Sequence, residues 1–477
     1  MLINQISFIN TLDELEKLKD NHFYRFFSLL KEKMNLSQFI SADFYYSYYR
    51  SIGRDRSYSL TSFLYAFILM KFLGITQVST FIAVLHLSPL LLELCEFEAV
   101  PDSAQFSRFK NSFDAYIHEF MTNLAEEAIH NSFQISPELA SMLIYDTSAV
   151  VPRVQENNPK FLNGIIKNMK GLKKINPKLD PYAAAYNNMP SHASANAEIA
   201  QVYANGIICY GLRFAIITNG LGIPLDVVFL DDDFKKKHPE IDFAKKEKSP
   251  DEDKSIADSV SLKPVLTDFF SRFTSFKPTV FLGDSAFDTH ATYPMLIKDF
   301  KFSKVVIPEN IRNTKALPAP GFNESGHPLC PFDNSLPMKY EGLTRGNGRA
   351  DRIKWSCPKT RFIKGKRVCF CNCKCTDSQL GRMFYTYPDE NYRMYPGLAR
   401  DTEEWIRLYK IRVAAEKTIN LAKTVFGSAF QQSLSPKSLK TDVYFSVIAQ
   451  ILTALLAVSI NETKHLRSAR RLMRKVA

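Results

Sequence analysis

One stretch of the sequence, YKIRVAAEKTINLAK at 409–423, carries four residue types that can act together on a phosphate group: Tyr409, Arg412, Glu416 and Lys423. The stretch lacks Gly and Pro and is rich in Ala and long polar side chains, so it favours a helix. At about 100° of rotation per residue, steps of three, four and seven place the four side chains on one face. Such a face either is a solvated ion-pair surface or lines a site where a carboxylate, two cations and a phenol act together.

Two upstream aspartates follow short apolar runs that are typical of buried strands. Residues 141–145, SMLIY, precede Asp146, and residues 278–283, PTVFLG, precede Asp284. We therefore expect each aspartate at the carboxyl end of a strand. A single aspartate in this position usually only caps a turn. Two of them followed by a helical Glu416 are the carboxylate set that a two-metal phosphoryl-transfer site requires.

The chemistry of cutting or joining DNA explains this requirement. One divalent ion activates water or a 3′-hydroxyl and another stabilises the leaving oxygen, with the ions about 3.5–4 Å apart. Hard oxygen ligands suit Mg²⁺, with Mn²⁺ as an alternative. The spacing within 409–423 resembles the Tyr-Arg-Glu-Lys (YREK) signature of bacterial insertion-sequence transposases of the DDE class. This resemblance implies that Asp146 bridges two ions and that Asp284 and Glu416 each flank one. It also implies DNA contacts by three residues: Tyr409, Arg412 and Lys423.

Length, composition and charge agree with a globular, DNA-binding chain. The 477 residues suggest two or three domains, and the 45% hydrophobic content supplies a sizeable core. The net charge of +12 favours a polyanionic partner such as nucleic acid. The first residues show no basic region followed by an apolar core, so we expect no secretory signal and a location in the bacterial cytoplasm, at the nucleoid. The apolar run at 443–460 is interrupted by polar residues, which favours a buried helix over a membrane segment.

Residues 1–135 are expected to form a helical amino-terminal domain. Apolar residues recur at helical spacing at 60–73 and 78–95. The order of these segments resembles the domain that precedes the catalytic core in such transposases, which implies contact with transposon-end DNA. The candidate cations are Arg108 and Lys110. The alternative is that each is a satisfied residue on a helix surface.

Residues 136–308 are expected to form the first part of the core. Apolar stretches at 207–218 and 223–230 flank a glycine-containing turn, which predicts an antiparallel hairpin of the same sheet. We interpret the three aspartates at 231–233 as a solvated loop rather than as metal ligands. Residues 152–200 form a lysine-rich insertion, which either follows DNA phosphates or is a mobile loop.

Residues 309–400 contain six of the eight cysteines and form a separate insertion. In a cytoplasmic protein such cysteines indicate metal binding or free thiols rather than disulfides. Their spacing is not the paired C-x₂-C of a zinc ribbon, so structural Zn²⁺ and free thiols both stay open. The family resemblance implies a largely β insertion that shapes the DNA channel. The candidate zinc ligands are Cys330, Cys357, Cys369, Cys371, Cys373 and Cys375.

The expected fold is α/β, with an RNase H-like catalytic core interrupted by a largely β insertion and a helical amino-terminal domain. Residues 401–477 supply the catalytic helix and a helical carboxyl terminus. The expected function is that of a DDE transposase that cuts and joins DNA at transposon ends. Its partners are terminal inverted repeats and target DNA, with a homodimer in the active complex. Two alternatives are a catalytically inactive transposase-derived DNA-binding protein and a zinc-containing nucleic-acid-binding module.

Overall fold

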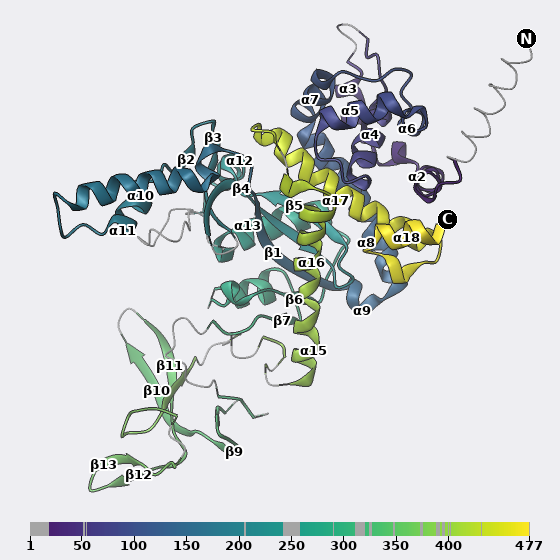
Figure 1. Cartoon of the computed structure of the whole chain (residues 1–477). Coiled ribbons are helices and arrows are strands. Elements are labelled where there is room, and N and C mark those ends of the chain that lie inside the picture. Colours follow the sequence, from purple (N-terminus) through teal and green to yellow (C-terminus); the bar gives the residue numbers. More distant parts are fainter. Residues whose placement is uncertain are drawn as a thin grey trace, which may run out of the picture. The chain divides into compact units, whose positions relative to one another are not determined.

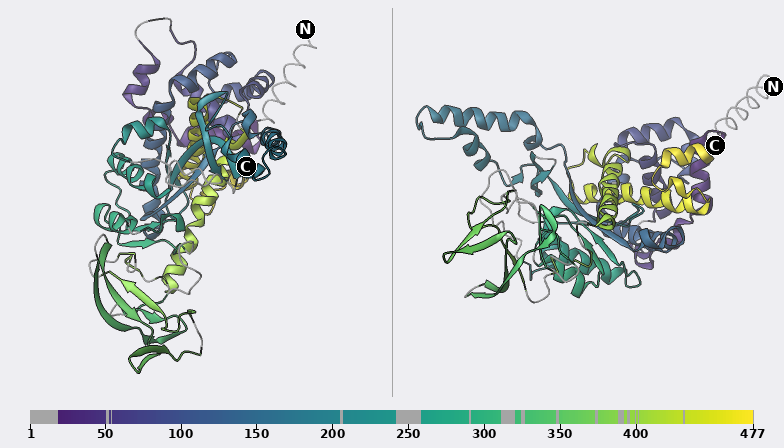
Figure 2. Two further views of the ribbon diagram at one scale, coloured as in Figure 1. Left: turned by 90° about the vertical axis from the view of Figure 1, so that its left-hand side faces the viewer. Right: turned by 90° about the horizontal axis from the view of Figure 1, so that it is seen from below.

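The chain divides into two compact units in the computed structural model (Figure 1, Figure 2). The first unit combines Met1–Lys277 with Ala414–Ala477, and the second unit is Pro278–Val413. The structure describes residues 19–50, 53, 55–204, 207–241, 258–289, 291–310, 320–323, 327–346, 349–372, 375–387, 392–393, 396–398, 400, 402–430 and 432–476.

The amino-terminal part of the first unit is helical, as the apolar periodicity predicts. Its helices are α2 (His22–Lys33), α3 (Ala42–Tyr48), α4 (Leu60–Phe72), α5 (Val78–Leu87), α6 (Pro89–Leu94), α7 (Ser103–Ser112) and α8 (Asp114–Ile135). The helix predicted at 60–73 is confirmed by α4. The helical run predicted at 78–95 is wrong in one respect, because a second helix begins at Pro89. Proline lacks a backbone donor and clashes with the preceding turn, so it is tolerated in the first turn of a helix.

The long helix α17 (Pro436–Ser459) is the core helix of this unit. It packs against α2, α4, α7 and α8, and α18 (Ala469–Val476) follows it. Among the described residues, α17 alone is long and apolar enough to cross a membrane, yet 94% of its most apolar window is buried inside the protein. Burial on all sides is typical of a core helix. The buried helix predicted at 443–460 is therefore confirmed.

Antiparallel strands lie between the helices of the first unit. Its strands are β1 (Met142–Val150), β2 (His192–Ala193), β3 (Asn196–Ala204), β4 (Ile207–Thr218) and β5 (Pro224–Phe229). The strand order is β2-β3-β4-β1, and β5 also pairs with β4. The predicted hairpin at 207–218 and 223–230 is therefore confirmed. Its turn needs glycine at position 220, because a Cβ there would lie 2.7 Å from the carbonyl oxygen of Leu139.

The three aspartates after β5 do not form a loop, which corrects the prediction for 231–233. Asp231 caps helix α12 (Asp232–Lys237) by accepting a hydrogen bond from the Phe234 amide at 3.0 Å. Negative residues in the first turn and lysines in the last turn both favour this short helix, because they complement its dipole. Helix α13 (Asp258–Arg272) follows later in the chain, and the short helix α9 (Pro137–Ala140) precedes β1.

A helical hairpin, which we call the arm, lies between β1 and β2. It consists of α10 (Pro159–Lys173) and α11 (Pro181–Asn187), which run side by side (Figure 1). Both helices begin with proline, and the side chains of Asn158 and Asp180 cap them. The lysine-rich insertion is therefore a helical hairpin at this point and not a loop, because local capping and an apolar stripe favour helix here.

The second unit contains two parallel strands, a group of short antiparallel strands and a helix. Strands β6 (Val280–Leu282) and β7 (Lys304–Val306) pair in parallel. The short strands are β8 (Leu329–Cys330), β9 (Asp333–Pro337), β10 (Lys339–Gly346), β11 (Arg349–Ser356), β12 (Thr360–Ile363), β13 (Lys366–Cys369) and β14 (Met383–Thr386). They form a β10-β11-β14 sheet and two separate hairpins, β8-β9 and β12-β13. Helix α15 (Glu403–Ile411) ends the unit. The fold as a whole is mixed α/β.

Candidate functional site

Asp146 lies inside a strand and not at its end, which corrects the sequence prediction. Strand β1 continues to Val150, and Asp146 pairs with Ile216 of β4. The neighbouring strand keeps supplying backbone partners past the apolar run, so the strand does not stop where its side chains become polar. The half-buried Asp146 carboxylate accepts a hydrogen bond from the Thr147 amide at 2.8 Å.

Lys423 lies against the polar half of β1. Its Nζ atom donates a hydrogen bond to Ser148 Oγ at 2.6 Å. Burial lowers the pKa of Lys423, while the nearby Cys209 thiol and Asp146 carboxylate act in the opposite direction. The structure therefore brings together two residues that the sequence assigned to one site, Asp146 and Lys423. The structure adds Ser148, which sequence reasoning did not single out, as the hydrogen-bond partner of Lys423.

The segment at 409–423 is not one regular helix, so the predicted single face needs correction. Helix α15 ends at Ile411 with Arg412 as its cap, α16 spans Val413–Asn420, and a π-helical turn spans Leu421–Val425. A π turn holds more residues than an α turn, so the rotation of about 100° per residue does not extend to Lys423. Such turns occur frequently at functional sites. Glu416 lies in the first turn of α16, where it is exposed to solvent.

Tyr409 and Arg412 belong to the second unit and contact each other. The Tyr409 ring stacks on Trp405 with a centroid distance of 5.0 Å, and the Arg412 guanidinium carbon lies 5.7 Å from the Tyr409 ring centroid. Stacking and cation–π contacts of this kind orient both side chains. Their predicted role in DNA binding stays a prediction.

Asp284 follows strand β6, as the sequence predicts. Its carboxylate caps a short 3₁₀ helix (Ser285–Phe287) by accepting a hydrogen bond from the Ala286 amide at 2.8 Å. The side chain is half-buried. This bond is also what an ordinary turn-capping aspartate makes, so the cap alone does not distinguish a structural role from a catalytic one.

Sequence reasoning missed Asp288, the most heavily bonded carboxylate next to Asp284. Its buried side chain accepts hydrogen bonds from Arg393 Nε at 2.9 Å and Arg393 Nη2 at 2.6 Å. Tyr293 Oη and the Asn310 amide donate two more, each at 2.8 Å. Burial raises the pKa of Asp288, but these donors outweigh it and hold the pKa below its usual value. The network fixes the segment that follows Asp284. In the sequence, the single sign of this network is the second Asp of the segment GDSAFD at 283–288.

The two amino-terminal cations have different environments. Arg108 lines a cavity of about 580 Å³ together with Arg56. Lys110 is 5% exposed and forms an ion pair with Asp442 of α17. The prediction that Lys110 contacts DNA therefore needs correction, because its ammonium group is buried against a carboxylate. The partner lies 332 residues further along the chain, which is why local sequence patterns do not reveal it.

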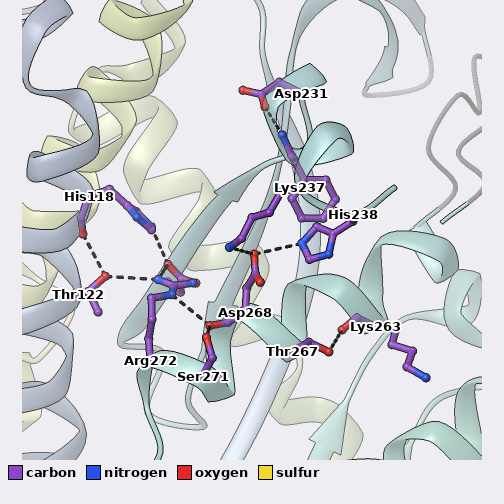
Figure 3. Close-up of polar contacts among 12 residues, drawn as sticks. His118, Thr122, Asp231, Lys237, His238, Lys263, Thr267, Asp268, Ser271 and Arg272 are labelled. Carbon is purple, nitrogen blue, oxygen red and sulfur yellow. Dashed lines mark hydrogen bonds and ion pairs between the residues drawn. The ribbon is translucent and has the colours of Figure 1, made fainter. Parts of the chain in front are cut away.

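A second buried ionic cluster joins α8, β5 and α13. Figure 3 shows His118, Thr122 and Arg272 directed toward one another. Arg272 Nη1 donates to Asp226 Oδ1 at 3.1 Å, and His118 Nε2 lies 3.0 Å from the same oxygen. Burial raises the pKa of Asp226, but the charge of Arg272 and the bond to His118 outweigh it, so the net pKa lies well below the usual range. The cluster ties helices to the sheet.

Metal binding stays a prediction for both candidate sites. Within the described residues, no group of three or more His, Cys, Asp or Glu side chains is arranged to hold a metal ion. Among the candidate zinc ligands, Cys330, Cys357 and Cys371 are buried, Cys369 and Cys375 are half-buried, and none of these five forms a disulfide. Cys373 lies outside the described residues.

The comparison with protein families bears on the amino-terminal helices. Residues 11–112 match the family model named Transposase domain (DUF772). The match covers the described helices α2 to α7 and includes Arg108 and Lys110. It supports a transposase.

Two further comparisons add less. A solved structure of the piggyBac transposase synaptic complex with hairpin DNA is similar over 95% of this chain and 78% of that chain, with 10% sequence identity and a TM-score of 0.37. A similarity at this level establishes neither a shared fold nor a shared function. No curated protein matches the chain.

Proposed function

We propose that the chain is a DNA transposase of the DDE class, which cuts and joins phosphodiester bonds at the ends of a mobile element. The observation that carries the proposal is the match of residues 11–112 to a transposase domain. Asp146, Asp284 and Glu416 are the proposed carboxylates of an RNase H-like core. Terminal inverted repeats and target DNA are the proposed partners, with a homodimer as the active form.

The contacts around Asp146 support the catalytic part of the proposal. A lysine amine that lies near a carboxylate is suited to hold a phosphate of the scissile strand, and Lys423 lies near Asp146 and donates a hydrogen bond to Ser148. Carboxylate oxygens are the ligand type that Mg²⁺ prefers. A bound Mg²⁺ pair would supply an activated water or 3′-hydroxyl and stabilise the leaving oxygen.

Cleavage of end DNA by charge-neutral variants tests the carboxylates. The substrate is the DNA that flanks the reading frame, incubated with the full chain and Mg²⁺. We expect Asp146→Asn, Asp284→Asn and Glu416→Gln each to abolish cleavage and to leave duplex binding intact. Asp233→Asn is the matched control, since the Asp233 side chain is 78% exposed. Cleavage at the wild-type rate by any of the three variants contradicts the assignment.

The same assay separates the two alternatives. A wild-type chain that binds the flanking DNA but never cleaves it indicates an inactive, transposase-derived DNA-binding protein. A chain that contains stoichiometric zinc and shows no Mg²⁺-dependent cleavage indicates a zinc-containing nucleic-acid-binding module.

Lys423 provides a finer test. Lys423→Ala should lower strand transfer about tenfold or more, because a lost charge-assisted phosphate contact costs about 1.5–3 kcal/mol. Ser148→Ala removes the hydrogen-bond partner of Lys423 and keeps the charge. We expect this control to retain most of the activity. Wild-type strand transfer by the Lys423→Ala variant contradicts the proposed phosphate contact.

A further inference from the structure

One face of helix α10 in the arm carries lysine and glycine in a regular order. Lys160, Gly164, Lys167, Gly171 and Lys174 are separated by steps of four, three, four and three residues, and all five are exposed. At about 100° per residue these positions lie on one side of the helix. Lys174 follows Lys173 in helical conformation as the carboxyl-terminal cap. The three lysines extend over about 21 Å at 1.5 Å per residue.

Among the described residues, no carboxylate forms an ion pair with Lys160, Lys167 or Lys174. The single acidic residue of the arm, Asp180, caps α11 through the amide of Tyr182 at 2.9 Å. Unpaired like charges in a row repel one another, so an exposed row of this kind is best stabilised by a polyanion.

The opposite side of α10 serves the fold of the arm. Helix α10 packs with α11, and Asn188 of the segment after α11 approaches Met169 with Nδ2 3.9 Å from the sulfur. Lys170 differs from the lysine row because its ammonium group lies 5.0 Å from the centroid of the Tyr182 ring. Contacts with α11 are therefore made by other positions, and the lysine–glycine face is left open to a partner.

The two glycines are not required by the fold. A Cβ atom at Gly164 or Gly171 would meet no atom within 4 Å, and neither residue has a positive φ. Glycine inside a helix costs about 0.5–1 kcal/mol relative to alanine. Two such residues on the exposed lysine face therefore weaken the helix without a packing reason. Their effect is to let a partner approach the helix backbone closely between the lysines.

We propose that this face of the arm binds the sugar–phosphate backbone of duplex DNA. The inference rests on the proposed function and adds a DNA contact outside the catalytic residues. Charge complementarity decides the occupant: B-DNA carries one negative charge per about 1.7 Å of its axis, so the lysine row spans about twelve phosphates on the two strands. Lysine is a point-charge phosphate ligand that needs no fixed orientation, so the contact is expected to be independent of sequence.

Salt-dependent binding of a mixed-sequence DNA duplex to the full chain tests the lysines. Removing two phosphate contacts lowers the slope of log K against log salt by about 1.8. We therefore expect this change for the Lys160→Ala/Lys167→Ala double variant. The matched control is Lys173→Ala/Lys178→Ala, which removes two exposed charges of the same hairpin off this face and should change the slope less. Equal effects of the two double variants overturn the proposal.

The glycines provide a second test, in which the expected effects on helix stability and on duplex binding have opposite signs. Gly164→Gln/Gly171→Gln should stabilise α10, because glutamine has the higher helix propensity, and should weaken duplex binding by filling the space between the lysines. Leu172→Gln is the control, since Leu172 is exposed on the same helix and lies about 120° around the axis from Lys160. Unchanged duplex affinity in the double glycine variant overturns the close approach.

Three outcomes separate this inference from the proposed function. Cleavage of end DNA by the wild type, with unchanged salt slopes in the lysine variants, refutes the arm contact alone. Duplex binding with the expected slopes but no cleavage refutes the transposase and supports the arm. A shift in oligomeric state of the Lys160→Ala/Lys167→Ala variant on size-exclusion chromatography, with an unchanged slope, overturns the DNA contact in favour of contact with a second copy of the chain.

Discussion

Lysine side chains occupy two opposite environments in the first unit. Lys71 and Lys110 are buried on either side of Asp442, with Lys71 Nζ 3.2 Å from Asp442 Oδ1. Burial lowers the pKa of Lys71, and the pair of lysines holds the pKa of Asp442 below its usual value despite burial. On α10, by contrast, Lys160 and Lys167 are exposed and have no acidic partner among the described residues.

The contrast shows that net charge alone does not locate a DNA-binding surface. The +12 of the chain counts both groups equally. The two buried lysines share the Asp442 carboxylate, so removal of that carboxylate is costly, and as buried groups they exert little field outside the protein. An exposed lysine without a partner contributes little to stability, and its field extends into the solvent. Substitutions should therefore separate the two groups by their effects on unfolding and on binding.

The largest effect is expected at Asp442. Asp442→Ala leaves two buried ammonium groups without a carboxylate, so the free energy of unfolding should fall by about 3–5 kcal/mol. Urea denaturation at neutral pH measures the change. Asp233→Ala, at an exposed position, should change it by at most about 0.5 kcal/mol. A similar small change at Asp442 would mean that the buried lysines are neutral and do not depend on this carboxylate.

Acid should destabilise the chain partly through Asp226. The pKa of this carboxyl is lowered in the folded chain, whereas the unfolded value is about 3.9. Its stabilisation is therefore present above about pH 3.9 and is lost as the pH falls toward the folded pKa. Asp226→Asn should cost about 1.5–3 kcal/mol at neutral pH and flatten the loss of stability as the pH falls below about 3.9. Urea midpoints across this pH range provide the measurement, and an unchanged pH profile contradicts it.

Replacement of glycine by alanine should stabilise the arm, whereas the core would not tolerate the same replacement. Gly164→Ala and Gly171→Ala should each stabilise α10 by about 0.5–1 kcal/mol, which corresponds to slower hydrogen exchange of its amides. Gly220→Ala is the opposing control, because its Cβ would lie 2.7 Å from Leu139 O. Faster exchange in the α10 variants would show that the fold itself needs these glycines.

The smallest effect on stability is expected for the lysine face. Lys160→Ala/Lys167→Ala should change the free energy of unfolding by at most about 0.5 kcal/mol, because exposed charges without partners contribute little. Thermal melting of the full chain checks this value. A loss of several kcal/mol would assign these lysines to the fold and erase the difference from Lys71 and Lys110.

Local patterns predicted the elements whose partners lie nearby in the sequence. The hairpin at 207–218 and 223–230 combines two apolar runs with a glycine turn, and both strands form as expected. The strand before Asp284 is likewise present. Asp146 differs because its strand continues through polar residues, and the extent of β1 is set by pairing with β4 rather than by its own side chains.

Long-range partners account for the features that the sequence did not reveal. The local sequence beside Arg108 predicts Lys110 as a surface cation, but the packing of α17 against α7 helps to bury it. The π turn that holds Lys423 also has no local signature in LAKTV. The importance of Asp288 becomes visible only with its partner Arg393, which lies 105 residues away in the sequence. These contacts depend on the tertiary fold, which periodicity and capping signals do not encode.

The order of synthesis gives the Asp442 cluster a temporal role. Asp442 is made 332 residues after Lys110, a delay of roughly 20–60 s at about 5–20 residues per second. During that interval the amino-terminal helices have neither the carboxylate nor the apolar surface of α17. The described amino-terminal helices therefore complete their core only after α17 has been synthesised, so their final folding waits for a much later part of the chain.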